Sequence, residues 1–140
     1  MEVKVKKLDS EARLPVYQHE GDAGMDLFSC ADCRLEPGAI SGVGTGIQMA
    51  IPKGHVGLVW DKSGLSLGGV HCLAGVVDAG YRGEIRVVLT NLGDRPFLVK
   101  KGMKIAQMLI QPVVSAVVRE SAELDDTARG QGGFGSTGLY

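Results

Sequence analysis

Aromatic residues are scarce in this chain, which has three Phe, three Tyr and one Trp among 140 residues but 21 glycines. A core built on aromatic packing is therefore excluded, and the glycines predict many tight turns, as proteins of short β-strands require. Neither sign of charge dominates, because 15 basic and 16 acidic residues leave a formal net charge of -1. Without a basic excess, nucleic acid is not an expected partner.

Long apolar runs are also absent, as is a charged leader followed by an apolar segment. A membrane-spanning helix needs about 20 consecutive apolar residues, so we expect no membrane partner, no secretion signal and a cytoplasmic location. The length of 140 residues allows one domain with a substantial core, but not two.

Cysteine is too scarce for a disulfide framework, because Cys30, Cys33 and Cys72 are an odd number and are most simply reduced thiols. The CADC spacing of the first two suits a metal or redox site. A zinc site needs two further ligands, however, and neither a second CxxC nor a nearby His pair supplies them, so small buried or half-buried thiols are the favoured interpretation. The histidines have no carboxylate or Cys in a triad-like context and are expected to be structural or surface residues: His19, His55 and His71.

What the sequence does contain is a series of short alternating or apolar segments separated by turns rich in Pro and Gly. Strands are predicted at residues 3–6, 25–31, 45–51, 55–61, 70–77 and 83–91, with two more in 103–120 around Pro112. Residues 63–69 are predicted to form a loop or a single helical turn, and no longer amphipathic helix is indicated. Short strands that recur about every ten residues are typical of an all-β barrel or double-sheet jelly roll.

A corner at residues 78–80 follows the predicted strand 70–77, because Asp bonds to its own backbone and Gly tolerates positive φ. We expect a hairpin here, with strand 83–91 burying Ile85, Val87 and Leu89 on one face and turning Glu84, Arg86, Val88 and Thr90 to the other. The corner then holds Asp78 rigidly, with Tyr81 nearby. Considered alone, it is most simply explained by Asp78 satisfying turn amides and Tyr81 packing.

The last segment, residues 121–140, loses the hydrophobic alternation of the preceding residues 1–120 and cannot pack by itself. A disordered tail is the simplest interpretation of its glycines. Arg129 and Phe134, however, place a cation and a ring among them, which suits a flexible arm that closes over an anionic, aromatic ligand.

Five segments together resemble the five signature motifs of the trimeric dUTP diphosphatase (dUTPase) family. They are DAGMDLFS (Asp22 to Ser29), DKSGLS (Asp61 to Ser66), GVVDAGYRGEI (Gly75 to Ile85), KGMKIAQMLI (Lys101 to Ile110) and RGQGGFGSTG (Arg129 to Gly138). The resemblance covers essentially the whole chain. It implies jelly-roll β-clip subunits in a homotrimer, with active sites at subunit junctions that hydrolyse dUTP to dUMP and pyrophosphate with Mg²⁺. Such an enzyme keeps uracil out of DNA and supplies dUMP for thymidylate synthesis.

The resemblance also implies a role for individual residues. Asp78 matches the aspartate that orients and deprotonates the attacking water, Tyr81 the ring against the deoxyribose, and Asp26 the aspartate that supports the water shell of the metal. The residues that match phosphate-binding positions are Lys62, Ser63, Gly64 and Gln107. Backbone groups of the segment from Cys72 to Val77 match those that pair with the uracil edge: Cys72, Gly75, Val76 and Val77. The closing arm is matched by Arg129, Phe134, Gly135 and Ser136.

The sequence departs from the family pattern at several points. Lys62 replaces the usual arginine, which keeps the charge but loses the bidentate fork. Cys72 stands where many relatives carry asparagine, and the segment from Ser63 to Asp78 is slightly short.

Two alternative functions fit the sequence less well. The dCTP deaminases share the fold but use a glutamate at the position of Val88, so the base for deamination is missing. A non-catalytic trimeric binding protein is expected to lose Asp78 or the arm, and the chain retains both.

Overall fold

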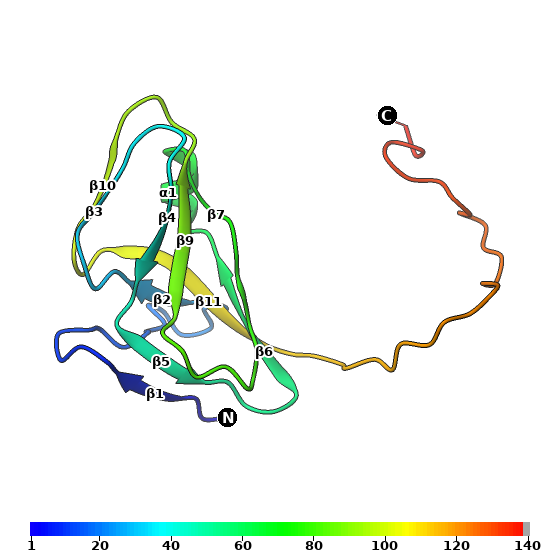
Figure 1. Ribbon diagram of the computed structural model, residues 1–140, viewed down its shortest axis with the longest axis horizontal. Coiled ribbons are helices and arrows are strands. Elements are labelled where there is room, and N and C mark those ends of the chain that lie inside the picture. The colour runs from blue at the N-terminus through cyan, green and yellow to red at the C-terminus, as the bar shows by residue number, and fades with distance from the viewer. Residues whose placement is uncertain (139–140) are drawn as a thin grey trace.

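The computed structural model describes residues 1–138, which fold into eleven short strands and one short helix (Figure 1). The elements in chain order are β1 (Lys4–Lys7), β2 (Met25–Phe28), β3 (Cys33–Leu35), β4 (Ile40–Gly44), β5 (Ile47–Ala50), β6 (His55–Trp60), α1 (Ser63–Leu67), β7 (Val70–Cys72), β8 (Val76–Val77), β9 (Arg86–Asn91), β10 (Phe97–Val99) and β11 (Lys104–Pro112). The all-β prediction is confirmed. No helix in this described part of the chain has the length and apolarity to cross a membrane.

Two antiparallel sheets form the body of the fold. One has the strand order β2-β11-β6-β8 and the other β4-β9-β7, while β1 pairs with β5 and β10 with β3. Strands that are distant in sequence lie side by side in both sheets, as in β11 beside β2 and β6. The arrangement fits a jelly-roll β-clip.

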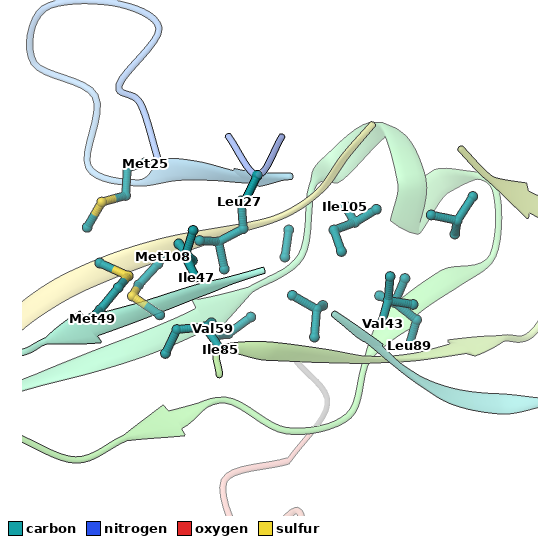
Figure 2. Close-up of a cluster of buried hydrophobic side chains, with 14 of the residues drawn as sticks. Met25, Leu27, Val43, Ile47, Met49, Val59, Ile85, Leu89, Ile105 and Met108 are labelled. Atoms are coloured by element: carbon teal, nitrogen blue, oxygen red, sulfur yellow. The ribbon is translucent and has the colours of Figure 1, made fainter. Parts of the chain in front are cut away.

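Side chains from the two larger sheets meet in one buried cluster (Figure 2). The labelled members come from β2, β4, β5, β6, β9, β11 and the segment before β9: Met25, Leu27, Val43, Ile47, Met49, Val59, Ile85, Leu89, Ile105 and Met108. The predicted inner face of strand 83–91 is confirmed by the burial of Ile85, Val87 and Leu89. Thr90 was expected on the outer face but is buried, at the end of β9 where Asn91 donates to the carbonyl of Leu35 in β3.

The predicted hairpin is confirmed only in part, because β7 pairs antiparallel with β9 but β8 does not. The expected strand 70–77 is divided into β7, which pairs with β9, and β8, which pairs with β6 in the other sheet. The chain crosses between the sheets at residues 73–75, and a Cβ on Gly75 would lie 2.5 Å from the Val59 carbonyl oxygen. Only glycine permits so close an approach to β6. Local alternation predicted a continuous strand because it carries no information about which distant strand pairs with which half.

Other elements also differ from the prediction. Two strands that were not predicted, β3 and β4, flank a turn at Pro37 and Gly38. Only one strand, β11, forms in residues 103–120, and the chain beyond Pro112 leaves the body of the fold (Figure 1). Val114, Val117 and Val118 are 91%, 81% and 93% exposed there. Their apolar side chains find no partner strand within the described residues.

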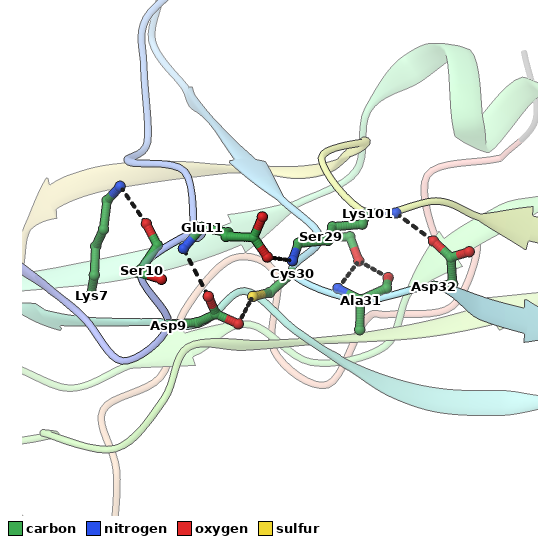
Figure 3. A network of polar contacts seen from close by, with 9 residues as sticks. All are labelled: Lys7, Asp9, Ser10, Glu11, Ser29, Cys30, Ala31, Asp32 and Lys101. Carbon is green, nitrogen blue, oxygen red and sulfur yellow. Dashed lines mark hydrogen bonds and ion pairs between the residues drawn. The ribbon is translucent and has the colours of Figure 1, made fainter.

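Polar contacts connect the loop after β1 to the loop that contains CADC (Figure 3). Asp9 Oδ2 lies 3.4 Å from Cys30 Sγ, and Asp32 accepts a hydrogen bond of 2.8 Å from the Lys101 amide. Burial and the neighbouring Asp9 raise the pKa of the Cys30 thiol. All three cysteines are free and half-buried. Hydrogen bonds and ion pairs hold the loop. Within residues 1–138 no three metal-binding side chains gather.

Candidate active site

The corner after β8 borders a cavity of about 190 Å³. Pairing of β8 with β6 fixes one wall, where the Val59 amide donates to the Gly75 carbonyl at 2.8 Å. Tyr81 is held by its hydroxyl, which donates to the Glu84 carbonyl at 3.0 Å. The cavity therefore collects Asp78 and all the predicted uracil and sugar residues except Cys72. It is lined by Val59, Ala74, Gly75, Val76, Val77, Asp78, Tyr81, Glu84, Ile85 and Arg86.

Asp78 lies exposed at the mouth of this cavity. The turn is closed by its backbone carbonyl, which accepts a hydrogen bond of 3.0 Å from the Tyr81 amide. Within the described residues no hydrogen bond or ion pair engages the Asp78 carboxylate. The corner thus holds its shape without the side chain, and the simpler interpretation, that the carboxylate satisfies turn amides, does not describe this structure.

A second cavity, of about 330 Å³, lies where β2 and β11 run side by side. It collects predicted phosphate and metal residues, and its lining includes Asp26, Lys62, Ser63 and Gln107. A Cβ on Gly24 would collide with the Gln107 side-chain amide, so a larger residue there would require this glutamine to move. Gly64, in α1, has open space beside its Cα.

Asp26 carries the main charge pairing of the second cavity. Its side chain is 2% exposed, with Lys62 Nζ 2.5 Å from Oδ1 and Lys104 Nζ 2.9 Å from Oδ2. Burial opposes ionisation, but the two lysines outweigh it and hold the pKa of this carboxyl below its ordinary value. The Lys104 contact is an ion pair without hydrogen-bond geometry, so Oδ2 has no hydrogen-bond donor among the described residues. The carboxylate is therefore ionised and has one oxygen with spare accepting capacity.

Cys72 borders a third cavity, of about 200 Å³, with Asp61 and His71. Asp61 Oδ1 accepts a hydrogen bond of 2.6 Å from the Cys72 amide, and His71 Nδ1 lies 2.7 Å from Oδ2. The expectation that no carboxylate accompanies His71 is wrong. Sequence reasoning missed Asp61 as a site residue because it lies ten positions from His71 and meets it only in the fold. Burial, with help from Asp61, raises the pKa of the Cys72 thiol to about 12.

The predicted arm residues lie apart from all three cavities. Residues 113–138 extend away from the β body (Figure 1), and Phe134 is fully exposed. Arg129 Nε donates only to the Gly132 carbonyl of the same segment, at 2.9 Å. The predicted arm also includes residues 139–140, which lie outside the described residues.

The cavity at the corner and the cavity of Asp26 have no lining residue in common. One offers a free carboxylate, a phenol ring and backbone groups, and the other offers lysine, serine and glutamine, which suit phosphate. An all-β fold with these two parts defines the class of nucleotide hydrolases built on a β-clip.

Comparison with known proteins specifies the family. A model of the dUTPase family matches residues 10–138. The chain is 50% identical over 141 residues to the deoxyuridine 5'-triphosphate nucleotidohydrolase of Clostridium kluyveri, with 99% of each chain covered. It is 47% identical over 144 residues to the protein of that name from Gloeothece citriformis, covering 99% of this chain and 98% of the relative.

Solved structures agree with these relatives. The dUTPase of Staphylococcus bacteriophage 80alpha with dUpNHpp matches with a TM-score of 0.92 and 29% identity, over 99% of each chain. A mutant dUTPase from phage phi11 of S. aureus, which reveals the coordination of a structural Mg(II) ion, matches with a TM-score of 0.82 and 26% identity, over 88% of this chain and 98% of that one. The chain belongs to the dUTPase family, whose activity is the hydrolysis of dUTP.

Proposed function

We propose that dUTP is hydrolysed to dUMP and pyrophosphate at sites assembled between the subunits of a homotrimer. The observation that carries this proposal is that the corner cavity and the Asp26 cavity share no lining residue within one chain. A nucleoside triphosphate must contact the groups of both. Each complete site is proposed to take the corner of one subunit and the phosphate-binding residues of another.

Asp78 is proposed as the general base. Because its carboxylate has no partner in the described chain, it is free to orient a water and to accept its proton during attack on the α-phosphorus. A carboxylate at a rigid corner reduces the entropy cost of aligning that water in line with the leaving pyrophosphate.

Uracil and deoxyribose are proposed to bind in the corner cavity. Backbone groups of Cys72, Gly75, Val76 and Val77 pair with the uracil edge, and the close approach of this segment to β6 leaves little freedom for a larger base. The ring of Tyr81, held through its hydroxyl, lies against the sugar and excludes a 2′-hydroxyl.

The triphosphate is proposed to bind at the Asp26 cavity through Lys62, Ser63, Gly64 and Gln107. Lys62 is already neutralised in part by Asp26, and its ammonium has two further N–H donors for phosphate.

Mg²⁺ is the proposed cofactor, and the residues fit it as an outer-sphere site. Asp26 is committed to two lysines, but Oδ2 lacks a hydrogen-bond donor and can accept one from a metal-bound water. When bound, Mg²⁺ would neutralise phosphate charge. Asp26 would then position the hydrated ion rather than ligate it directly.

The C-terminal arm is proposed to close over the bound nucleotide. Its glycines have the positive φ values that a hinge or tight turn needs, at Gly130, Gly135 and Gly138. Arg129 would clamp the γ-phosphate and Phe134 would stack on uracil, with the backbone of Gly135 and Ser136 beside the phosphates.

We propose a cytoplasmic location for this enzyme, since three free thiols suit a reducing compartment. Neither nucleic acid nor a membrane is a proposed partner. The partners are dUTP and two further copies of the chain.

One assay tests the proposed reaction against the deaminase alternative. The purified protein is incubated with Mg²⁺ and, in separate reactions, dUTP, dCTP, dTTP or dATP. Pyrophosphate and dUMP from dUTP are expected, without ammonia from dCTP. Release of ammonia would favour deamination, although the matching glutamate position is Val88 in β9.

A further inference from the structure

Asp61 connects the segments of Cys72, Gln107 and Lys62. The proposed function gives each of these three segments a separate task. Oδ1 accepts the Cys72 amide hydrogen at 2.6 Å, where the proposed uracil-binding segment begins. The backbone carbonyl of Asp61 accepts a hydrogen bond of 2.8 Å from Gln107 Nε2, and the next residue is Lys62. One aspartate is thus bonded to the base-recognition segment and to the phosphate-binding glutamine.

The carboxylate of Asp61 is well suited to hold a backbone amide. It is about one-quarter exposed, at 24%, so water competes weakly for it. Burial opposes its ionisation, but the Cys72 amide and His71 outweigh this effect and lower its pKa. A hydrogen bond from an amide to an ionised acceptor is about twice as strong as one between neutral groups.

The segment anchored by Asp61 has few other restraints. Residues 73–75 pass from the β7 sheet to the β8 sheet, held by the Leu73 amide on the Val88 carbonyl at 2.9 Å and the Val59 amide on the Gly75 carbonyl at 2.8 Å. The bond at Cys72 is the only one of these three restraints that depends on a side chain. The thiol of the same residue, Cys72, is neutral, because its pKa is raised to about 12.

We propose that Asp61 is a positioning residue that determines selectivity for uracil, by holding the Cys72 backbone where the proposed uracil-binding segment begins. The inference rests on the proposed function, in which residues 72–77 contact the uracil edge. Asp61 touches neither phosphate nor the reacting water in this role. Its loss should therefore weaken discrimination between bases far more than it slows the chemical step.

Four variants separate geometry from charge. Asp61→Ala removes the acceptor for the Cys72 amide, and Asp61→Glu keeps the charge but moves the acceptor by one methylene. Asp61→Asn keeps an oxygen at the same distance without the charge. His71→Ala is the matched control, because it removes the other partner of the same carboxylate and leaves the Cys72 bond intact. All four leave the backbone bond to Gln107 in place.

The measured quantities are kcat and KM for dUTP, dCTP and dTTP. For Asp61→Ala and Asp61→Glu we expect KM for dUTP to rise about tenfold and the preference for dUTP over dCTP to fall about tenfold, with kcat changed less than about threefold. His71→Ala should stay within about threefold of the unmodified protein, and Asp61→Asn, which keeps the acceptor without its charge, should lose less selectivity than Asp61→Ala. Hydrogen exchange at the Cys72 amide should be faster in Asp61→Ala and Asp61→Glu only. If Asp61→Ala does not fold, the contrast between Asn and Glu carries the test.

Unchanged selectivity in Asp61→Ala would overturn this inference but not the proposed function. A loss of selectivity in Asp61→Asn as large as that in Asp61→Ala would have the same consequence. A fall in kcat with intact selectivity would also overturn it, because that pattern indicates a general structural effect. Absence of pyrophosphate from dUTP with the unmodified protein would instead contradict the proposed function itself.

Discussion

Asp78 and Asp26 are both aspartates near a nucleotide site, yet their surroundings give them opposite properties. Asp26 is buried and paired with Lys62 and Lys104, whereas Asp78 is exposed and unpaired among the described residues. A paired carboxylate is a poor base because its charge is already stabilised. The free carboxylate at the corner is the one suited to accept a proton from water.

The first prediction concerns that proton transfer. Asp78→Asn keeps the size of the side chain but removes the base, so kcat for dUTP should fall at least about a hundredfold, within the usual contribution of a general base. The dissociation constant for dUTP should change little, because the corner is closed by the backbone. Single-turnover kinetics and equilibrium binding measure the two effects. Normal turnover in this variant would remove Asp78 from its proposed role.

A second prediction concerns the thiol of Cys72. With its pKa raised to about 12, only a minute fraction is thiolate at pH 8, and the thiolate is the reactive form. In a Cys30→Ser, Cys33→Ser background, alkylation of Cys72 by iodoacetamide should be about a thousandfold slower in the folded protein than in urea. Mass spectrometry follows the labelling. Equal rates in the two states would show that neither burial nor Asp61 restrains this thiol.

At the scale of elements, the turn after β9 depends on one buried amide. Asn91 is 1% exposed, and its Nδ2 donates to the carbonyls of Leu35 and Arg95 at 3.0 and 2.7 Å. Its Oδ1 accepts the Gly93 amide hydrogen at 3.0 Å. The side chain thus connects β9, β3 and the turn that leads to β10.

Asn91→Ala should lower the free energy of unfolding by about 2–3 kcal/mol, because it leaves buried carbonyls without a donor. Urea unfolding at fixed protein concentration measures this change. Asp94→Ala, an exposed neighbour in the same turn, is the control and should stay within about 0.5 kcal/mol. Equal stability of the two variants would show that water replaces the Asn91 hydrogen bonds.

The C-terminal arm is the element whose position depends most on the ligand. Outside the β body it buries almost nothing, so its removal should leave the fold intact. Deletion of residues 129–140 should give a protein with unchanged circular dichroism and unchanged oligomeric mass but little dUTP hydrolysis. The deletion removes the Phe134 ring and the Arg129 cation, and with them the exclusion of water from the site. Full activity without the arm would refute the closing role.

At the scale of the whole molecule, the exposed valines after β11 indicate a contact with another protein chain. Val114 and Val118 are 91% and 93% exposed, and no strand of the described chain pairs with this segment. Exposed apolar side chains in a segment without a partner strand are suited to addition at the edge of another subunit's sheet. They are the feature of the isolated chain that best supports the proposed trimer.

Val114→Asp with Val118→Asp should therefore convert a trimer into monomers and reduce dUTP hydrolysis at least about a hundredfold, because charges at a buried interface are costly. Light scattering measures the mass, and pyrophosphate release the activity. Leu92→Asp, at an equally apolar but distant exposed leucine, should affect neither. A monomer that retains full activity would contradict assembly of the site between subunits.

The sequence by itself determined the class of fold, the strand faces and the residues that match the family. Alternation in 83–91 correctly predicted the buried Ile85, Val87 and Leu89, and five ordered motifs identified the family. These features are local, because side-chain period and turn chemistry are set by neighbours in the chain.

Only the tertiary structure decided which strands pair and which polar groups meet. Residues 70–77 were predicted as one strand but divide between two sheets, because the partners of β7 and β8 lie far away in sequence. The meeting of Asp61 with Cys72, across eleven positions, follows from that division. The free energy of such contacts depends on closing long loops and packing distant strands, which no local pattern encodes.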